Sequence, residues 1–386
     1  MANNDKSRFS FLLNLRLLFW TYLVLAVGVS VHKYLVHTLN VFLTLKTSFF
    51  NLIAGNDLYA LYPQFHFDYY KYGPTFALLV GPIAILPDVA GAIAWNALNA
   101  MLLFYAVTSL GLAERQKALI LWIVLIELTT SLQNFQSNGL YAALFLLTLA
   151  CFEDGKPSLA ALIVALGGLV KIFGLAAGIL FLFYRRKGAF AFWLAVWLVV
   201  LGLLPLVVIS PEKLVFLYQS WFGLLTRDVS NYLGLSVMGG LRSWFGLAAP
   251  NLWVMLAGGA LTLLPLLRTS KYGDVRFRYL LLSSLLLWAV IFNHKAESPM
   301  FVIAVTGVAL WYVLTAGHDS AAYRIARNIL LAFVLVATSL SATDAFPAYW
   351  REAVVEPYLL KVVPCILAWL WLQGELLFGG RSLTDS

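Results

Sequence analysis

Two acids in one polar segment are the leading catalytic candidates of this chain. Asp57 stands in Gly55-Asn-Asp57-Leu-Tyr59, and Asp68 follows in the same segment. A carboxylate held beside a substrate can act as a general base and accept the proton of an attacking hydroxyl group. The alternative for either acid is a solvated loop residue or the cap of a short helix. Asp57 is our first choice, although composition alone does not separate it from Asp68.

His294 and Lys295 begin a polar cluster that continues with Glu297 and Ser298. A histidine in such a turn could shuttle a proton or hydrogen-bond a leaving group. The plainer interpretation is a group of polar side chains that reach for water at a helix end.

Two cations could bind a phosphate group. Lys171 interrupts an apolar run, and a lysine at the bilayer centre costs about 2.5–3.5 kcal/mol on insertion scales, so it must face a cavity or a partner. An ion pair with Glu127, in another apolar run, is the structural alternative. Arg242 ends Gly234-Leu-Ser-Val-Met-Gly-Gly-Leu-Arg242, where it could grip a lipid phosphate through a bidentate contact or simply be solvated.

Other chemistries find no support in the sequence. There is no phosphate-binding loop, dinucleotide fingerprint, zinc motif or nucleophile elbow, so an ATP-driven pump is not indicated. The two cysteines, Cys151 and Cys365, lie in or beside apolar runs, which predicts inert packing.

The chain that must position these residues has the composition of a membrane protein. Of its 386 residues, 62% are hydrophobic and 11% are charged, against about 25% charged residues in an ordinary soluble domain. This excludes a soluble globule and a disordered chain and predicts an all-α, polytopic membrane protein. The net charge of +8 fits cytoplasmic anchoring or an anionic ligand. It gives no reason to expect nucleic acid as a partner.

A window of about 19 residues gives about twelve apolar runs that could cross the bilayer. They cover 12–30, 74–88, 91–111, 118–132, 137–152, 158–183, 189–209, 250–267, 279–292, 299–316, 326–344 and 357–378. No internal repeat is visible, which argues against a secondary transporter.

Basic residues in the N-terminal segment and in short connections set the predicted orientation. They are Lys6, Arg8, Arg16, Arg185, Arg186, Lys187, Arg268, Lys271, Arg276, Arg278, Arg324 and Arg327. The positive-inside rule makes their side the cytoplasm, with the first span retained although it resembles a signal peptide. Asp57, Arg242 and His294 then face outward, and the amide-rich turn at 133–138 faces the cytoplasm.

Two long outer segments, 31–73 and 210–249, belong to a single predicted domain over 1–386. In the first, apolar residues recur at helical spacing from Leu35 to Leu52 with polar residues between them. This predicts an amphipathic helix over 31–54 in the membrane interface, which Gly55 can end.

Several short motifs resemble glycosyltransferase family 87, whose members are integral membrane enzymes of the GT-C fold. In chain order the motifs are Gly55-Asn-Asp57-Leu-Tyr59, Tyr72-Gly-Pro74-Thr-Phe-Ala-Leu-Leu, Pro82-Ile-Ala-Ile-Leu-Pro87, Trp95-Asn-Ala-Leu-Asn99, the stretch 133–138, Gly168-Leu-Val-Lys171-Ile-Phe-Gly and Asn293-His294. Three positions depart from the family pattern. Gly73 replaces the first proline of a common Tyr-Pro-Pro motif. Gly234-Leu-Ser236 stands where the family has Asn-Gln-Ser, and Ile172 replaces the proline that follows the lysine.

The resemblance implies transfer of a sugar, most simply mannose, from a polyprenyl-phosphate donor to a lipid or glycan acceptor, on the outer face of the cytoplasmic membrane. Family members use an acid of the first outer loop as general base, which matches Asp57, and His294 matches their histidine-bearing outer turn. The candidate substrate-binding residues are Lys171, Arg242, Lys295, Tyr59 and Asp68. Membrane lipids and the lipid-linked donor are the expected partners. No cofactor and no metal cluster are predicted, while a divalent ion at the phosphate stays open.

One base and several cations fit a single displacement with inversion. Two other classes stay open. A lipid-linked sugar flippase or secondary transporter would use Lys171 and Glu127 as midplane charges. A non-catalytic assembly protein of the cell envelope would tolerate replacement of Asp57.

Overall fold

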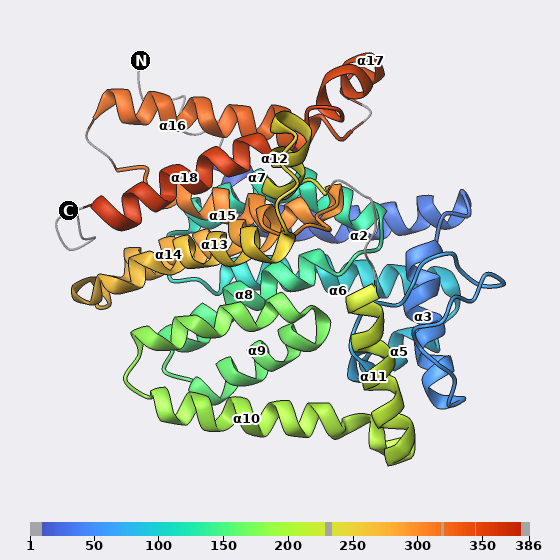
Figure 1. The fold of residues 1–386 in the computed structure, drawn as a ribbon. Helices are drawn as coiled ribbons and strands as arrows, with labels where there is room; N and C mark the ends of the chain where they lie inside the picture. The colour runs from blue at the N-terminus through green and yellow to red at the C-terminus, as the bar shows by residue number, and fades with distance from the viewer. Residues whose placement is uncertain (1–9, 228–233, 318–319, 344, 380–386) are drawn as a thin grey trace. The chain divides into compact units, whose positions relative to one another are not determined.

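The structure is a computed structural model that describes residues 10–227, 234–317, 320–343 and 345–379 (Figure 1). Lys6 and Arg8 of the predicted orientation signal lie outside these ranges. Every regular element in the described residues is a helix, as the composition predicts. The chain divides into two compact units. Unit 1 comprises Met1–Phe19, Leu110–Ser131 and Tyr232–Ser386, and unit 2 comprises Trp20–Ser109 and Leu132–Asn231. The single domain over 1–386 stays a prediction.

Apolar helices long enough to cross a bilayer confirm a multi-pass membrane protein. In the described residues four helices reach this length: Leu15–Leu35, Asp88–Thr108, Lys187–Val207 and Ala321–Leu340. Six further apolar helices are shorter: Asn138–Glu153, Pro157–Val170, Ile172–Phe183, Asn251–Leu267, Ser298–Leu314 and Val363–Phe378. The number of crossings, predicted as twelve, stays a prediction.

Unit 2 holds the first long loop and the helices that support it. Its helices are α2 (Leu15–Leu35, which begins in unit 1), α3 (Asn40–Ile53), α4 (Pro74–Leu79), α5 (Gly81–Ala84), α6 (Asp88–Thr108), α8 (Asn138–Glu153), α9 (Pro157–Val170), η2 (Ile172–Phe183), α10 (Lys187–Leu203), η3 (Leu204–Val207) and α11 (Pro211–Arg227). The helices α8, α9 and α10 pack in succession (Figure 1).

Unit 1 is built around α14 and α15, which pack along each other and against α18. Its helices are η1 (Ser10–Leu13), α7 (Glu114–Gln133, which ends in unit 2), α12 (Val237–Phe245), α13 (Asn251–Leu263), η4 (Leu264–Leu267), η5 (Thr269–Lys271), α14 (Val275–Ile291), η6 (Ser298–Met300), α15 (Phe301–Leu314), α16 (Ala321–Phe333), η7 (Val334–Leu340), α17 (Ala348–Trp350), η8 (Arg351–Val355) and α18 (Val363–Phe378). Nearly all residues of α14 and α15 are buried, as expected of helices that are apolar on all sides.

The span predicted at 74–88 is wrong. The segment forms two short helices, α4 with six residues and α5 with four. Ten helical residues rise only about 15 Å, half of the ~30 Å hydrocarbon core. Pro74 begins the first helix and Pro82 stands in the second, and a proline cannot donate the hydrogen bond that would join them into one rod.

The span predicted at 158–183 is wrong as a single helix. It bends at Lys171, whose extended backbone (φ −148°, ψ 132°) separates α9 from η2. The two helices then pack against each other. Gly174 makes this possible, because a Cβ atom there would lie 2.2 Å from the carbonyl carbon of Gly167. The segment is therefore a helical hairpin with Lys171 in its turn.

The amphipathic helix of the first loop is present but starts later than predicted. Helix α3 covers Asn40–Ile53, and α2 extends to Leu35, so the helix predicted over 31–54 is broken. The break contains His37 at a positive φ of 54°. Gly55 ends α3 as predicted, with φ at 68° and its N–H donated to Leu52 O.

The amide-rich turn at 133–138 lies against the first long loop, because Ser137 Oγ donates to the hydroxyl of Tyr72 at 3.1 Å. The turn and the loop were predicted on opposite sides of the membrane, whereas this contact brings them together within unit 2. Helix α6 fixes the turn: Trp95 Nε1 donates to Phe135 O at 2.8 Å, and Asn99 Oδ1 accepts the Leu140 N–H at 3.0 Å.

Candidate functional site

Asp57 lies in the loop directly after α3, and its own turn orients it. The carboxylate oxygen Oδ1 accepts the backbone N–H of Tyr59 at 3.1 Å, which is the hydrogen bond of an Asx turn. The hydroxyl of Tyr62 donates to the backbone oxygen of Asp57 at 2.7 Å. The aspartate is half-buried, so its carboxylate is held in place and still reaches the surface.

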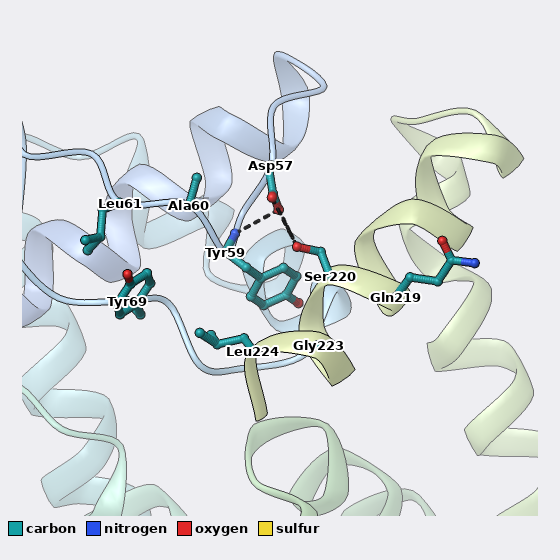
Figure 2. A pocket seen from close by; sticks show the side chains of 9 residues that line it. All are labelled: Asp57, Tyr59, Ala60, Leu61, Tyr69, Gln219, Ser220, Gly223 and Leu224. Atoms are coloured by element: carbon teal, nitrogen blue, oxygen red, sulfur yellow. Dashed lines mark hydrogen bonds between the residues drawn. The ribbon is translucent and has the colours of Figure 1, made fainter. Parts of the chain in front are cut away.

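A second element, helix α11, meets the carboxylate from the other side. Ser220 Oγ lies 3.0 Å from Asp57 Oδ1 and 3.1 Å from Oδ2. Figure 2 shows Ser220 and the Tyr59 N–H converging on the carboxylate. A hydroxyl and an amide are neutral donors, so the carboxylate is hydrogen-bonded here without an ion pair.

An open pocket of about 510 Å³ lies beside Asp57 (Figure 2). It combines a carboxylate, aromatic rings, an amide and small apolar groups. Its lining residues are Asp57, Tyr59, Ala60, Leu61, Tyr69, Gln219, Ser220, Gly223 and Leu224. A pocket of this size, with one carboxylate in its wall, could receive a hydroxyl-bearing substrate.

Tyr59 is a structural support of the pocket. Its side chain is 4% exposed, and the hydroxyl donates to Tyr72 O at 3.0 Å. Burial raises the pKa of Tyr59 well above the ordinary tyrosine value, with smaller contributions from nearby groups including Tyr70 and Asp57. The phenol therefore stays neutral and keeps donating this hydrogen bond at physiological pH.

Lys171 lies in the turn of the α9–η2 hairpin, in the same unit as Asp57. Its Nζ donates to Asn138 Oδ1 at 2.6 Å and lies 5.9 Å from the centre of the Tyr141 ring. Asn138 is the first residue of α8, so the ammonium group lies at a helix N-terminus, where the helix dipole favours anions.

Hydrogen bonds within unit 2 connect Lys171 to the Asp57 loop. Asn138 follows Ser137, whose Oγ donates to the Tyr72 hydroxyl, and Tyr72 O accepts from Tyr59. The hairpin itself is tied to the loop, because the Gly73 N–H donates to Leu169 O at 3.0 Å. A proline at position 73, as in the family's common Tyr-Pro-Pro, has no N–H and could not make this hydrogen bond. This explains why the chain has Gly73 instead.

The ion pair considered between Lys171 and Glu127 does not form. Glu127 Oε1 instead accepts from Lys361 Nζ at 2.7 Å, with side chains that are 0% and 3% exposed. Both members of this pair belong to unit 1. Lys361 also lies 5.1 Å from the centre of the Phe301 ring. The sequence did not single out Lys361, which is an isolated cation near the start of the apolar run at 357–378.

Asp68 and Asp57 have different surroundings. Asn40 Nδ2, at the start of α3, donates to Asp68 Oδ2, and Asn40 Oδ1 accepts the Phe67 N–H at 2.8 Å. Asp68 is exposed and is absent from the lining of the Asp57 pocket. This geometry favours Asp57 as the base and gives Asp68 a role in holding the loop to α3.

The remaining candidates lie in unit 1, where two chain segments meet. Leu235 N–H donates to Ala296 O at 2.8 Å, which brings the start of α12 to the turn that contains His294 and Lys295. A Cβ at Gly234 would lie 2.2 Å from His294 O, so the approach requires glycine and explains this departure from the family pattern. His294 and Lys295 are half-buried, and Arg242 is exposed on α12.

Comparison with protein families now gives the decisive observation. The model of glycosyltransferase family 87 matches residues 70–339. The chain belongs to glycosyltransferase family 87. No curated protein matches it. As a family 87 member, the chain is a membrane glycosyltransferase. The matched range contains Lys171, Ser220 and His294, while Asp57 lies upstream of it.

The candidate site contains residues to which the sequence analysis gave no role in chemistry. Ser220 and Asn138 are the main ones, and each contacts a predicted residue from a distant part of the chain. The amide-rich stretch indicated Asn138 only as part of a turn. The described residues show no group of three or more His, Cys, Asp or Glu side chains that could hold a metal ion. The predicted absence of a metal cluster stays a prediction, and a divalent ion at the phosphate stays open.

Proposed function

We propose that this family 87 enzyme transfers a sugar from a polyprenyl-phosphate donor to a hydroxyl group of a lipid or glycan acceptor, with Asp57 as general base. The observation that supports this most is the half-buried Asp57 carboxylate at the wall of an open pocket. Its hydrogen-bond partners are neutral, and it has no cation in an ion pair with it among the described residues. Such a carboxylate is accessible to a substrate and is not occupied by a cation.

The proposed step is a direct displacement. Asp57 takes the proton of the acceptor hydroxyl, whose oxygen attacks C1 of the donor sugar. The bond between C1 and the phosphate oxygen breaks, and the polyprenyl phosphate leaves with the electron pair. A single displacement inverts the configuration at C1 and needs no covalent sugar–enzyme intermediate.

Lys171 is the proposed contact for the departing phosphate in unit 2. It combines an ammonium group with the N-terminus of α8, and both favour an anion. For unit 1 taken by itself, we propose that Arg242 and Lys295 can bind a phosphate group and that His294 can donate a hydrogen bond to one. Tyr59 supports the pocket from behind.

A lipid-linked donor fits the first loop better than a nucleotide sugar. The amphipathic helix α3 immediately precedes Asp57, and we propose that it lies in the membrane interface, where a lipid-linked donor would approach. The sequence has no nucleotide-binding motif. Mannose is proposed as the sugar from the family resemblance alone.

We propose that the site faces outward from the cytoplasmic membrane, because basic residues gather in short connections that the positive-inside rule assigns to the cytoplasm. A single cysteine at position 57, in a background without Cys151 and Cys365, should react with an impermeant thiol reagent in intact cells. Reaction only after permeabilisation would contradict the outward placement.

The donor is tested with purified protein. We expect transfer from a synthetic polyprenyl-phosphate mannose to a membrane-lipid extract, and no transfer from the matching nucleotide sugar. Preference for the nucleotide sugar would overturn the proposal. Use of a polyprenyl-phosphate hexose or pentose other than mannose would correct the sugar and leave the mechanism intact.

A further inference from the structure

Ser220 is the one side chain whose hydrogen bonds reach both oxygens of Asp57 in the described residues. It comes from α11, and 163 positions of sequence separate it from its partner. A serine hydroxyl has one proton to donate, and its oxygen lies at near-equal distances of 3.0 and 3.1 Å from the two carboxylate oxygens. The contact therefore restricts rotation of the carboxylate.

Helix α11 is anchored on both sides of Ser220. Trp221 is 5% exposed, and its Nε1 donates to Lys71 O at 3.0 Å. The Tyr218 hydroxyl donates to Gly202 O, at the end of α10, at 2.9 Å. Since one neighbour is bonded to the first loop and the other to α10, the helix backbone that carries Ser220 is held beside Asp57.

Gln219 shows that lining the pocket does not by itself bring a residue to the base. It precedes Ser220 on α11 and also lines the pocket, but Figure 2 shows its amide pointing away from Asp57. The hydrogen bond to Asp57 is thus specific to position 220 of α11 and is not shared by its neighbour Gln219.

We propose that Ser220 is a positioning residue for the general base. This inference rests on the proposed function of Asp57. Ser220 holds the carboxylate so that its remaining lone pairs face the pocket, where the acceptor hydroxyl arrives. A neutral hydroxyl suits this task, because a lysine or arginine in its place would compensate the negative charge that must attract the proton.

The test compares two variants of equal shape. Ser220→Thr keeps the hydroxyl and Ser220→Val replaces it with a methyl group. Thr226→Val is the matched control, because Thr226 lies on the same helix and donates only to Phe222 O and Gly223 O within it. All are purified and assayed with polyprenyl-phosphate sugar, and kcat and the acceptor KM are measured separately.

We expect Ser220→Val to lower kcat by about 10–100-fold, because a displaced base can cost up to 10²-fold, with the acceptor KM within about 3-fold. Ser220→Thr should stay within about 3-fold of the wild type, and Thr226→Val should match the wild type. In an Asp57→Asn background, Ser220→Val should lower the residual rate no further, since the base it positions is already gone. A purely structural role would add its loss in both backgrounds.

Equal kcat for Ser220→Val and Ser220→Thr would overturn the positioning role, as would a loss confined to KM or an additive loss in Asp57→Asn. If Ser220→Val does not elute as a monodisperse protein, Ser220→Ala takes its place in the same comparison. The two proposals are distinguishable. Full activity of Asp57→Asn would refute the base itself, whereas inactive Asp57→Asn with fully active Ser220→Val would refute only the positioning.

Discussion

Two carboxylates of this protein, Asp57 in unit 2 and Glu127 in unit 1, have opposite surroundings. Asp57 is half-buried, borders a pocket and accepts hydrogen bonds from a serine hydroxyl and a backbone amide. Glu127 is fully buried and paired with the ammonium group of Lys361 at 2.7 Å. The first can meet a substrate, while the second already has its cation and has no access to solvent.

The comparison shows that burial of an acidic residue among apolar residues does not by itself indicate a catalytic role. Burial of a glutamate in an apolar run is costly, so a partner is expected for Glu127, and the sequence offered Lys171 as that partner. In the structure, the ion pair with Lys361 in unit 1 offsets the free-energy cost of burying Glu127. Asp57 has neutral partners, so no cation among the described residues competes with a substrate for its carboxylate. Four sets of substitutions break or sharpen this difference.

The largest effect should follow Asp57→Asn. The amide keeps the shape of the side chain and loses its basicity, so we expect kcat to fall by about 10²–10⁴-fold, the usual contribution of a general base. Thermal unfolding in detergent should change little. Asp68→Asn is the matched control from the same loop and should keep most of the activity. If Asp68→Asn is inactive and Asp57→Asn is active, the base has been assigned to the wrong acid.

Breaking the Glu127–Lys361 pair should affect stability rather than chemistry. Glu127→Gln or Lys361→Met leaves one buried charge without its partner, which typically costs about 3–5 kcal/mol. The double change Glu127→Leu with Lys361→Met removes both charges and should recover most of that loss. Thermal unfolding and turnover per folded molecule measure the two effects. A single variant that unfolds normally and yet does not turn over would move Glu127 into the mechanism.

Removal of the Lys171 charge should weaken donor binding. A hydrogen bond to a charged group contributes about 1.5–3 kcal/mol, so Lys171→Met should raise the donor KM by about 10-fold or more. The acceptor KM should stay the same. Lys171→Arg keeps the charge and should recover part of the affinity. If Lys171→Met raises only the acceptor KM, the ammonium group binds the other substrate.

The smallest effect should come from the turn that leads into Asp57. Gly55 has a φ of 68° and open space around it, so Gly55→Ala meets only the conformational cost of a left-handed residue, about 1–2 kcal/mol. Gly28, inside α2, also has open space, and Gly28→Ala should stabilise the helix by up to about 1 kcal/mol. Unfolding measurements that show the same sign for both changes would contradict the role of Gly55 as a helix terminator.

Much of the fold could be predicted from the sequence because the bilayer imposes length and composition on long helices. The runs at 12–30, 91–111, 189–209 and 326–344 each correspond to one of the four long apolar helices. The runs at 74–88 and 158–183 failed for a common reason. Hydropathy counts apolar residues, but it does not show where a chain turns back, and the turn at Lys171 depends on the contact between Gly167 and Gly174.

The site could be predicted only as separate residues. Asp57 and Lys171 were indicated by residue type and by motif, and each has partners that no local pattern predicts. Ser220 is an ordinary serine in an amphipathic stretch until the fold brings α11 to the Asp57 loop. In the same way, the choice of Lys361 over Lys171 as the partner of Glu127 depends on tertiary packing.

The configuration of the product at C1 tests most directly whether Asp57 activates the acceptor for direct displacement. The purified enzyme would be given a polyprenyl-phosphate sugar of one defined anomer, and the new glycosidic bond would be examined by NMR after the first turnovers. We predict inversion, because one carboxylate acting as a base permits a single displacement. Retention of configuration would require two displacements through an enzyme-bound sugar, and it would contradict the assignment of Asp57 as a base.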